Sequence, residues 1–354
     1  MRRDQLPPHK GATYVLPRWR VVYVSVSKAA CTSIKWLLAE VQEESPERFY
    51  TALTREVSRP MTIHWRPLWQ HTPMLHELSD DELEPISPDE GWFLFTVVRH
   101  PSPRLWSSWQ SKLLLREPRW VEKFGDAPWF PRIPRTTQDV VDDFRRFAHA
   151  VAEDPDQTIM RDRHFRPQNQ LATPERTPYT RIYDLSAMPE LLEDLARHLR
   201  GRGWDGSLEL RGANETPLRP LASMFTPDVT AAIGKVYAED FERFGYENVP
   251  PNQLEVSDDY GEPALREIAR LVDRGERIGD LALSAQRLKR ARRADREKIK
   301  KLKRKVARLQ ASRRRNGALA RKAKRRISSV LKGNRGARHE HSETDSADQP
   351  HALR

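Results

Sequence analysis

The chain has 354 residues, and its 62 lysines and arginines outnumber its 50 acidic residues to give a formal net charge of +12. Hydrophobic residues make up 38% of the chain, which suffices for a folded domain of roughly 200 to 250 residues and a polar remainder. No window approaches the ~18 consecutive apolar residues of a membrane-spanning helix, which excludes an integral membrane protein. The amino-terminal segment also lacks the apolar stretch of a secretory signal. The single cysteine, Cys31, excludes an intrachain disulfide and a cysteine-based zinc site and favours a reducing, cytoplasmic location.

The first 250 residues alternate between strand and helix patterns. Strands are predicted at residues 21–26, 92–98 and 179–183. Helices are predicted at 34–40, 103–112, 139–152, 189–199 and 227–244, and Thr32 and Ser33 are candidate N-caps of the first. Residues 45–90 are expected to form an irregular Pro-rich segment and residues 118–135 a loop. Strand–loop–helix units of this kind predict an α/β domain whose central parallel sheet is flanked by helices.

The charge is concentrated in the last quarter of the chain. Residues 281–338 hold 24 basic and two acidic residues, a net charge of +22, whereas residues 1–280 carry −7. A heptad register runs from Leu281 to Val330 with alternating spacings of four and three, but several of its positions are polar, which predicts a weak coiled coil. We therefore expect a domain at 1–250, a linker and helical segment at 251–280, a basic heptad helix at 281–332 and a disordered tail at 333–354.

The loop after the first predicted strand has the composition of an anion site. Lys28, Ala29, Ala30 and Cys31 lead into Thr32 and Ser33 at the start of a helix. Helix-start amides attract anions, small side chains allow a phosphate to come close, and the lysine adds a charge. The loop lacks the G-x-x-x-x-G-K-[ST] pattern of a Walker loop. The alternative is a solvent-facing lysine before an ordinary capped helix.

A second anion-binding pair follows the next predicted strand. Arg99 leaves the strand end and Ser107 lies on the helix after it. Because ligands of open α/β sheets bind at the carboxyl ends of neighbouring strands, both side chains could hold a second phosphate beside the first. The alternative for Arg99 is a surface salt bridge.

Five segments, in this order, resemble the Golgi-type carbohydrate sulfotransferases (chondroitin, dermatan and related enzymes). They are VSKAACTS at 26–33, FTVVRHP at 95–101 with Arg104, Leu105 and Ser107, HFRPQ at 164–168, NETP at 214–217 and YAEDFERFGY at 237–246. They match the family's P-K-x-A-C-T-N, F-V-R-x-P-x-x-R-L-x-S, H-W-x-P-Q, N-x-T and Y-x-x-D-F-x-x-F-G-Y segments. Ser27 and Ser33 depart from the family pattern, and the cysteines that follow H-W-x-P-Q in Golgi members are absent. The chain thus resembles a cytoplasmic, bacterial-style member.

The resemblance implies a P-loop-like domain that binds 3′-phosphoadenylyl sulfate (PAPS). It implies that Lys28 and the loop through Ala29, Ala30, Cys31, Thr32 and Ser33 hold the 5′-phosphosulfate, and that Arg99 and Ser107 hold the 3′-phosphate. In-line transfer to a carbohydrate or glycoconjugate hydroxyl needs charge neutralisation by Lys28 and no metal. Related sulfotransferases place the general base between the two phosphate-binding segments, which favours His64 over His71, His76 and His164. His164, Arg166 and Gln168 are expected to bind the acceptor.

Several alternatives remain open from the sequence. A kinase-like phosphoryl transferase could use the same cradle, although a Walker Gly-Lys pair and a magnesium-binding aspartate are missing. An inactive domain could instead serve a scaffold or nucleic-acid-binding protein. The basic segment 281–332 could be a solvated helix, a homodimer seam, or a ligand for an anionic membrane or polyanion, which would place the protein at the inner membrane surface. The aromatic side chains that could stack on sugars, or simply form the core, are Trp106, Trp109, Trp120, Trp129 and Phe130.

Overall fold

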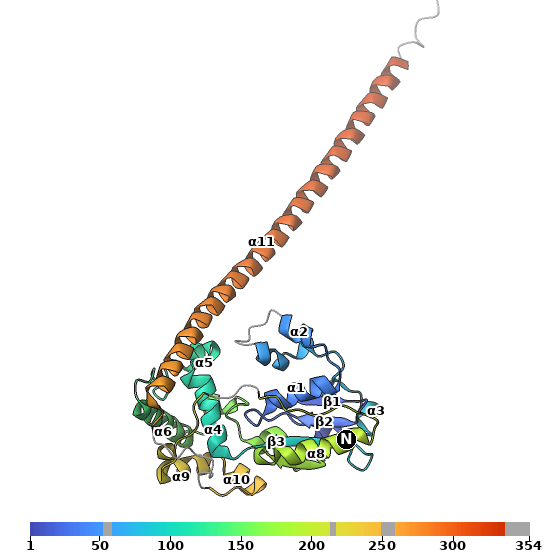
Figure 1. Ribbon diagram of the computed structural model, residues 1–354. Helices are drawn as coiled ribbons and strands as arrows, with labels where there is room; N and C mark the ends of the chain where they lie inside the picture. Colours follow the sequence, from blue (N-terminus) through green and yellow to red (C-terminus); the bar gives the residue numbers. More distant parts are fainter. Residues whose placement is uncertain (52–58, 213–216, 249–258, 337–354) are drawn as a thin grey trace, which may run out of the picture. The chain divides into compact units, whose positions relative to one another are not determined.

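The computed structural model describes residues 1–51, 59–212, 217–248 and 259–336 (Figure 1). The chain divides into two units, Met1–Ala282 and Leu283–Arg354. The first is a mixed α/β unit, and the described part of the second is helical.

A four-stranded sheet in the order β1-β2-β3-β4 forms the centre of the first unit. The strands are β1 (Thr13–Leu16), β2 (Val21–Val24), β3 (Phe93–Val98) and β4 (Arg181–Asp184). β2 pairs with β3, and β3 with β4, in parallel, as predicted. The sheet also has a strand that the sequence did not predict, β1, which runs antiparallel to β2 through a tight turn in which Arg20 adopts a φ of 50°.

Alternate strand side chains pack into two different apolar clusters. Val21 and Tyr23 join a cluster with helices α1 (Cys31–Val41) and α8 (Met188–Arg200), which lie beside the sheet in Figure 1. Val22 joins a smaller cluster with the amino-terminal segment. β1, β2 and β3 are therefore buried on both faces, as their largely apolar sequences require, whereas β4 (RIYD) is partly exposed.

A third cluster lies within the helices that follow β3. It contains side chains of α4 (Pro101–Trp109), α5 (Pro118–Phe124), α6 (Thr137–Glu153), α9 (Pro227–Val236), α10 (Ala238–Phe244) and the start of α11 (Gly261–Gly336). The five aromatic residues considered above as sugar-stacking candidates, Trp106, Trp109, Trp120, Trp129 and Phe130, are all buried there. The structure thus favours a core role for these side chains.

Several local expectations need correction. Helix α1 begins at Cys31 and its N-cap is Ala30 in a left-handed conformation, so Thr32 and Ser33 lie in the first turn. Residues 118–135 contain α5, and the helix expected at 227–244 is divided at Tyr237 into α9 and α10. The segment expected to be irregular contains α2 (Pro46–Thr51), α3 (Asp80–Leu83) and the 3₁₀ helices Arg59–His64, Arg66–Leu68 and Leu75–Glu77. The remaining short elements are the 3₁₀ helices Arg3–Gln5, Thr158–Arg161, Leu185–Ala187 and Ala222–Met224, and α7 (Gln168–Ala172).

Helix α11 starts well before the predicted heptad region. Its first turns belong to the first unit, where Ile268 and Val272 are buried and Glu276 lies 2.8 Å from Arg116. In the second unit the heptad side chains, such as Leu288 and Leu302, are exposed. None of the helices in the described residues is apolar over enough length to span a membrane. The coiled coil stays a prediction.

Candidate functional site

The loop between β2 and α1 is tightly turned by two left-handed residues. Lys28 has a φ of 69° and Ala30 a φ of 52°. The Ile34 amide donates to the Ala30 carbonyl at 3.0 Å and so starts the helical ladder. The amides of residues 31–33 precede that first ladder bond, and helix-start amides of this kind can donate to an anion. Left-handed geometry at residues other than glycine is strained and is characteristic of ligand-binding loops.

Lys28 is buried in this loop, with 9% of its surface exposed. Loss of solvation, together with the nearby Lys112, lowers the pKa of its ammonium group to about 7. Among the described residues, no carboxylate forms an ion pair with Lys28. A buried lysine without a counterion is costly in the free protein, which makes this position a candidate for binding an anion.

Arg99 lies against the same loop, at the end of β3. One of its guanidinium nitrogens is 3.5 Å from the Lys28 carbonyl oxygen. Burial and the neighbouring Arg104 lower the pKa of Arg99 to about 10. The structure therefore brings Lys28 and Arg99 together, as the parallel arrangement of β2 and β3 predicts. Ser107 follows on α4 and is buried.

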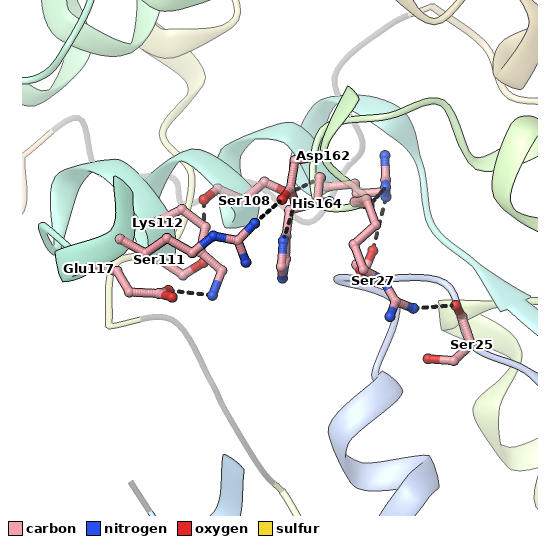
Figure 2. Close-up of polar contacts among 11 residues, drawn as sticks. Ser25, Ser27, Ser108, Ser111, Lys112, Glu117, Asp162 and His164 are labelled. Carbon is pink, nitrogen blue, oxygen red and sulfur yellow. Dashed lines mark hydrogen bonds and ion pairs between the residues drawn. The ribbon is translucent and has the colours of Figure 1, made fainter. Parts of the chain in front are cut away.

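Two arginines that the sequence analysis gave no role hold the loop in place. Arg104 Nε donates to the Ser27 carbonyl at 3.0 Å, and Arg163 donates to the Ser25 carbonyl at 3.1 Å. Figure 2 shows Ser25 and Ser27 at the ends of these contacts. Arg104 also donates to the Arg163 carbonyl at 3.2 Å. Arg104 belongs to the second of the five segments described above, the one that contains Arg99. No local sequence pattern pointed to Arg163.

His64 lies beside α1, but both of its ring nitrogens have partners. Nδ1 is 2.9 Å from Lys35 Nζ and Nε2 is 3.0 Å from Thr32 Oγ1. Burial lowers the pKa of Lys35 to about 7, and burial together with Lys35 holds the pKa of His64 well below its usual value. A lysine that donates to Nδ1 leaves the proton on Nε2, which then donates to Thr32. These contacts tie His64 to α1, and its role as the general base stays a prediction.

The other histidine candidates differ in position. The His71 backbone amide donates to Glu44 at 2.8 Å on an exposed segment, and His76 lies near Lys10 and Arg3. His164 is close enough to Lys28 and Lys112 for both to lower its pKa, in addition to burial. Only His64 and His164 of these four lie at the Lys28 loop in the structure as described.

The three residues expected to bind an acceptor have different surroundings. His164 Nδ1 lies 2.7 Å from Asp162 Oδ1, and Arg166 donates to His9 Nε2 at 3.3 Å. Gln168 is fully buried: its amide group bonds both the backbone amide and the carbonyl of Arg99, at 2.9 and 2.7 Å. Gln168 thus positions Arg99, and its contact with an acceptor stays a prediction.

Lys112 is a further site residue that the sequence analysis missed. Helix α4 continues into a π-helical turn, Gln110–Leu114, in which the Leu115 amide donates to the Gln110 carbonyl at 3.0 Å. Lys112 lies in this turn and forms an ion pair with Glu117 (Figure 2). A π turn cannot be read from helical periodicity, although such turns are frequent at functional sites.

The charges of the site are mostly positive. Lys28, Lys35, Arg99, Arg104 and Arg163 gather at the ends of β2 and β3, and none of them is ion-paired with a carboxylate of the described residues. Nor do the described ranges contain a group of three His, Cys, Asp or Glu residues that could hold a metal ion. Such an arrangement can hold a ligand with several negative charges. Metal-independent chemistry stays a prediction.

A comparison with protein-family models identifies one match. The model described as the sulfotransferase family matches residues 12–247, more than half of the chain, and the match includes all four strands, the Lys28 loop, Arg99 and His164. No curated protein and no solved structure matches the chain. Residues 214–216 of the NETP segment lie outside the described residues. On the extent of this match, the chain belongs to the sulfotransferase family.

Proposed function

We propose that this protein transfers the sulfuryl group of PAPS to a hydroxyl of a carbohydrate or glycoconjugate. The observation that carries the proposal is the buried Lys28 with Arg99 and Arg104 beside it, none of which is ion-paired with a carboxylate of the described residues. A donor with a 5′-phosphosulfate and a 3′-phosphate supplies the negative charge that these groups lack. Family membership supports sulfuryl transfer as the chemistry.

The chain's residues divide between the two ends of such a donor. The amides of Cys31, Thr32 and Ser33 would hold the 5′-phosphate, and the small side chains of Ala29 and Ala30 leave room for its approach. This use of a strand–loop–helix unit is P-loop-like.

Arg99 and Ser107 would hold the 3′-phosphate. The side chain of Gln168 would position Arg99 through hydrogen bonds to its backbone amide and carbonyl. Lys28 would stabilise the charge that develops on the leaving phosphate oxygen. When bound, PAPS supplies an activated sulfuryl group, so the protein's task is mainly orientation and charge neutralisation.

The acceptor would approach from the side of His164. Lys112, His164 and Arg166 offer polar groups there, and hydroxyl recognition needs donors and acceptors of this kind. The acceptor class rests on the resemblance to carbohydrate sulfotransferases.

Calorimetry with adenosine 3′,5′-bisphosphate tests the donor assignment. We expect binding to the wild-type chain in EDTA, a large loss in Lys28→Ala, and unchanged binding in the control Lys235→Ala, which changes an exposed lysine of α9. Binding of ATP alone, with a magnesium requirement, would support the kinase alternative. Absence of any nucleotide binding would support the scaffold alternative.

For the basic segment 281–332 we propose attraction to an anionic membrane surface, with the protein cytoplasmic and peripheral. In a two-stranded coiled coil, the e and g positions of the two helices face each other across the heptad seam. In this register the charged residues at these positions are all basic: Lys289, Arg296, Lys298, Lys303, Lys305, Lys324 and Arg326. This like-charge pattern disfavours a homodimer. The exposed apolar residues Leu302 and Val306 could enter the interface of a membrane, where each nearby basic residue adds about 1 kcal/mol.

Liposome sedimentation tests this tail assignment. The full chain should bind vesicles that contain phosphatidylserine, and this binding should weaken as the salt concentration rises. A chain that ends at residue 282 should not bind the vesicles. Binding to nucleic acid but not to vesicles would support a polyanion partner instead.

A further inference from the structure

His164 and His64 both lie near Lys28, but the structure leaves their rings in different states. An ionised carboxylate can only accept hydrogen bonds, so the 2.7 Å contact to Asp162 Oδ1 places the ring proton of His164 on Nδ1. In the neutral ring, Nε2 then carries the lone pair. The described contacts of His64, in contrast, occupy both nitrogens.

The ring of His164 is held from several sides. Asp162 Oδ1 accepts hydrogen bonds from both the backbone amide of His164, at 3.0 Å, and its ring Nδ1. The carboxylate therefore contacts the backbone and the side chain of His164. Ser108 Oγ donates to the His164 carbonyl at 2.6 Å, and the Trp120 ring meets the imidazole edge-on with centroids 6.0 Å apart. Arg119 lies 3.5 Å from the other oxygen of Asp162. The imidazole is therefore fixed before any substrate binds.

The position of the ring suits a reaction beside Lys28. Figure 2 shows the imidazole of His164 pointing away from the backbone of Asp162, between Lys112 and the loop that carries Ser25 and Ser27. The titratable groups that face His164 are Asp162, Lys112, Lys28 and His64. Burial and the two lysines lower the pKa of His164 to about 3, so the ring is neutral at neutral pH and its Nε2 is unprotonated.

We infer that His164 is the general base of the proposed sulfuryl transfer and that Asp162 is its positioning residue. The acceptor hydroxyl gives its proton to Nε2 while its oxygen forms a bond to sulfur. The bond between sulfur and the bridging phosphate oxygen breaks, and its electron pair stays on that oxygen beside Lys28. The imidazolium returns its proton to water after product release. A carboxylate that orients a histidine in this way is a recurrent arrangement for base catalysis. The inference rests on the proposed function and replaces the prediction that favoured His64.

The kinetic test compares three histidine variants of the full chain. Sulfate transfer from radiolabelled PAPS to a panel of methyl glycosides is measured for His164→Gln, His64→Gln and His149→Gln. His149 is a matched control, because it also contacts an aspartate, Asp228 at 3.0 Å, on an exposed surface. We expect His164→Gln to lower kcat/KM by about 10²- to 10⁴-fold with unchanged affinity for adenosine 3′,5′-bisphosphate.

His64→Gln should lose less, because an amide can replace both ring contacts, and His149→Gln should match the wild type. Asp162→Asn should lower kcat by about tenfold or more and shift the acidic limb of the pH profile. Activity of His164→Gln within threefold of the wild type, or a larger loss in His64→Gln, would overturn the inference.

A measurement without turnover separates this inference from the proposed function. In protein labelled with ¹⁵N-histidine, the His164 signals, identified by their loss in His164→Gln, should show a protonated Nδ1 and an unprotonated Nε2 at pH 7.5. Asp162→Asn should redistribute that proton. A proton on Nε2 would overturn the base assignment even if the wild type transfers sulfate. Failure of the wild type to sulfate any glycoside would contradict the proposed function, and the location of the ring proton would still test His164.

Discussion

Nucleotide binding should draw a proton into the protein, because Lys28 is partly deprotonated when no ligand is bound. Its pKa of about 7 in the free protein leaves ~10% of the ammonium form at pH 8. A phosphate group beside it restores the ordinary lysine pKa of ~10.4, at which the amine is almost fully protonated at pH 8. Binding of adenosine 3′,5′-bisphosphate at pH 8 should therefore take up ~0.9 proton at Lys28, and the dissociation constant should rise about tenfold per pH unit between pH 7 and 10.

Calorimetry in two buffers with different ionisation enthalpies measures this uptake directly. At pH 8 the ligand's own phosphates are already ionised, so they contribute little. Lys28→Arg keeps the charge but does not titrate in this range, and should bind with much smaller proton uptake. Any uptake left in that variant would come from Lys35, whose pKa is also about 7. Zero net uptake by the wild type at pH 8, with binding intact, would refute the reasoning about Lys28.

Three further variants test the supports of the site. Gln168→Ala should weaken bisphosphate binding by about five- to 100-fold, since the backbone of Arg99 loses its partners; calorimetry checks this against the exposed control Gln138→Ala, and equal affinities would contradict it. Lys35→Met removes a neighbouring charge, so the pKa of His64 should rise toward its usual value in an NMR titration, and a further fall would count against the contact. Trp120→Phe should lower kcat more than it lowers bisphosphate affinity, because it changes the packing beside His164. A larger loss in affinity than in kcat would argue against a role of Trp120 in placing His164.

The sequence predicted the parts of the fold that local patterns encode. The strands β2 and β3 are apolar runs with β-branched residues, β4 has Ile182 and Tyr183 at its centre, and the helices α1, α6 and α8 show regular apolar spacing. Strand β1 was missed because it has only four residues and its turn to β2 lacks the glycine or Asn-Gly signal of a hairpin. Helix α5 was missed because its proline, Pro118, marks the first turn of a helix as readily as a loop.

The site could be predicted only where its residues share a segment. Lys28 and Arg99 follow neighbouring strands, so sequence alone placed them together. The contact of Arg163 with Ser25, and the approach of Lys112 to His164, depend on how distant segments pack, and no local spacing reports that. The inference that favours His164 over His64 rests on which ring nitrogen has a partner, which is a property of three-dimensional contacts.

The buried lysine should also make the stability of the ligand-free protein depend on pH. The pKa of Lys28 is lower in the folded chain than in the unfolded one, so the unfolded chain binds more protons between pH 7 and ~10.4, and folding stability rises with pH in that window. Lys28→Met removes this contribution. The wild type should therefore gain ~1.4 kcal/mol per pH unit relative to Lys28→Met between pH 7 and 10, measured by urea unfolding. Saturating bisphosphate should abolish that slope, because the bound lysine holds its proton as firmly as an unfolded one. Equal slopes for the two proteins without ligand would show that Lys28 is solvated in the folded state, and the anion site would then lack the buried charge on which it depends.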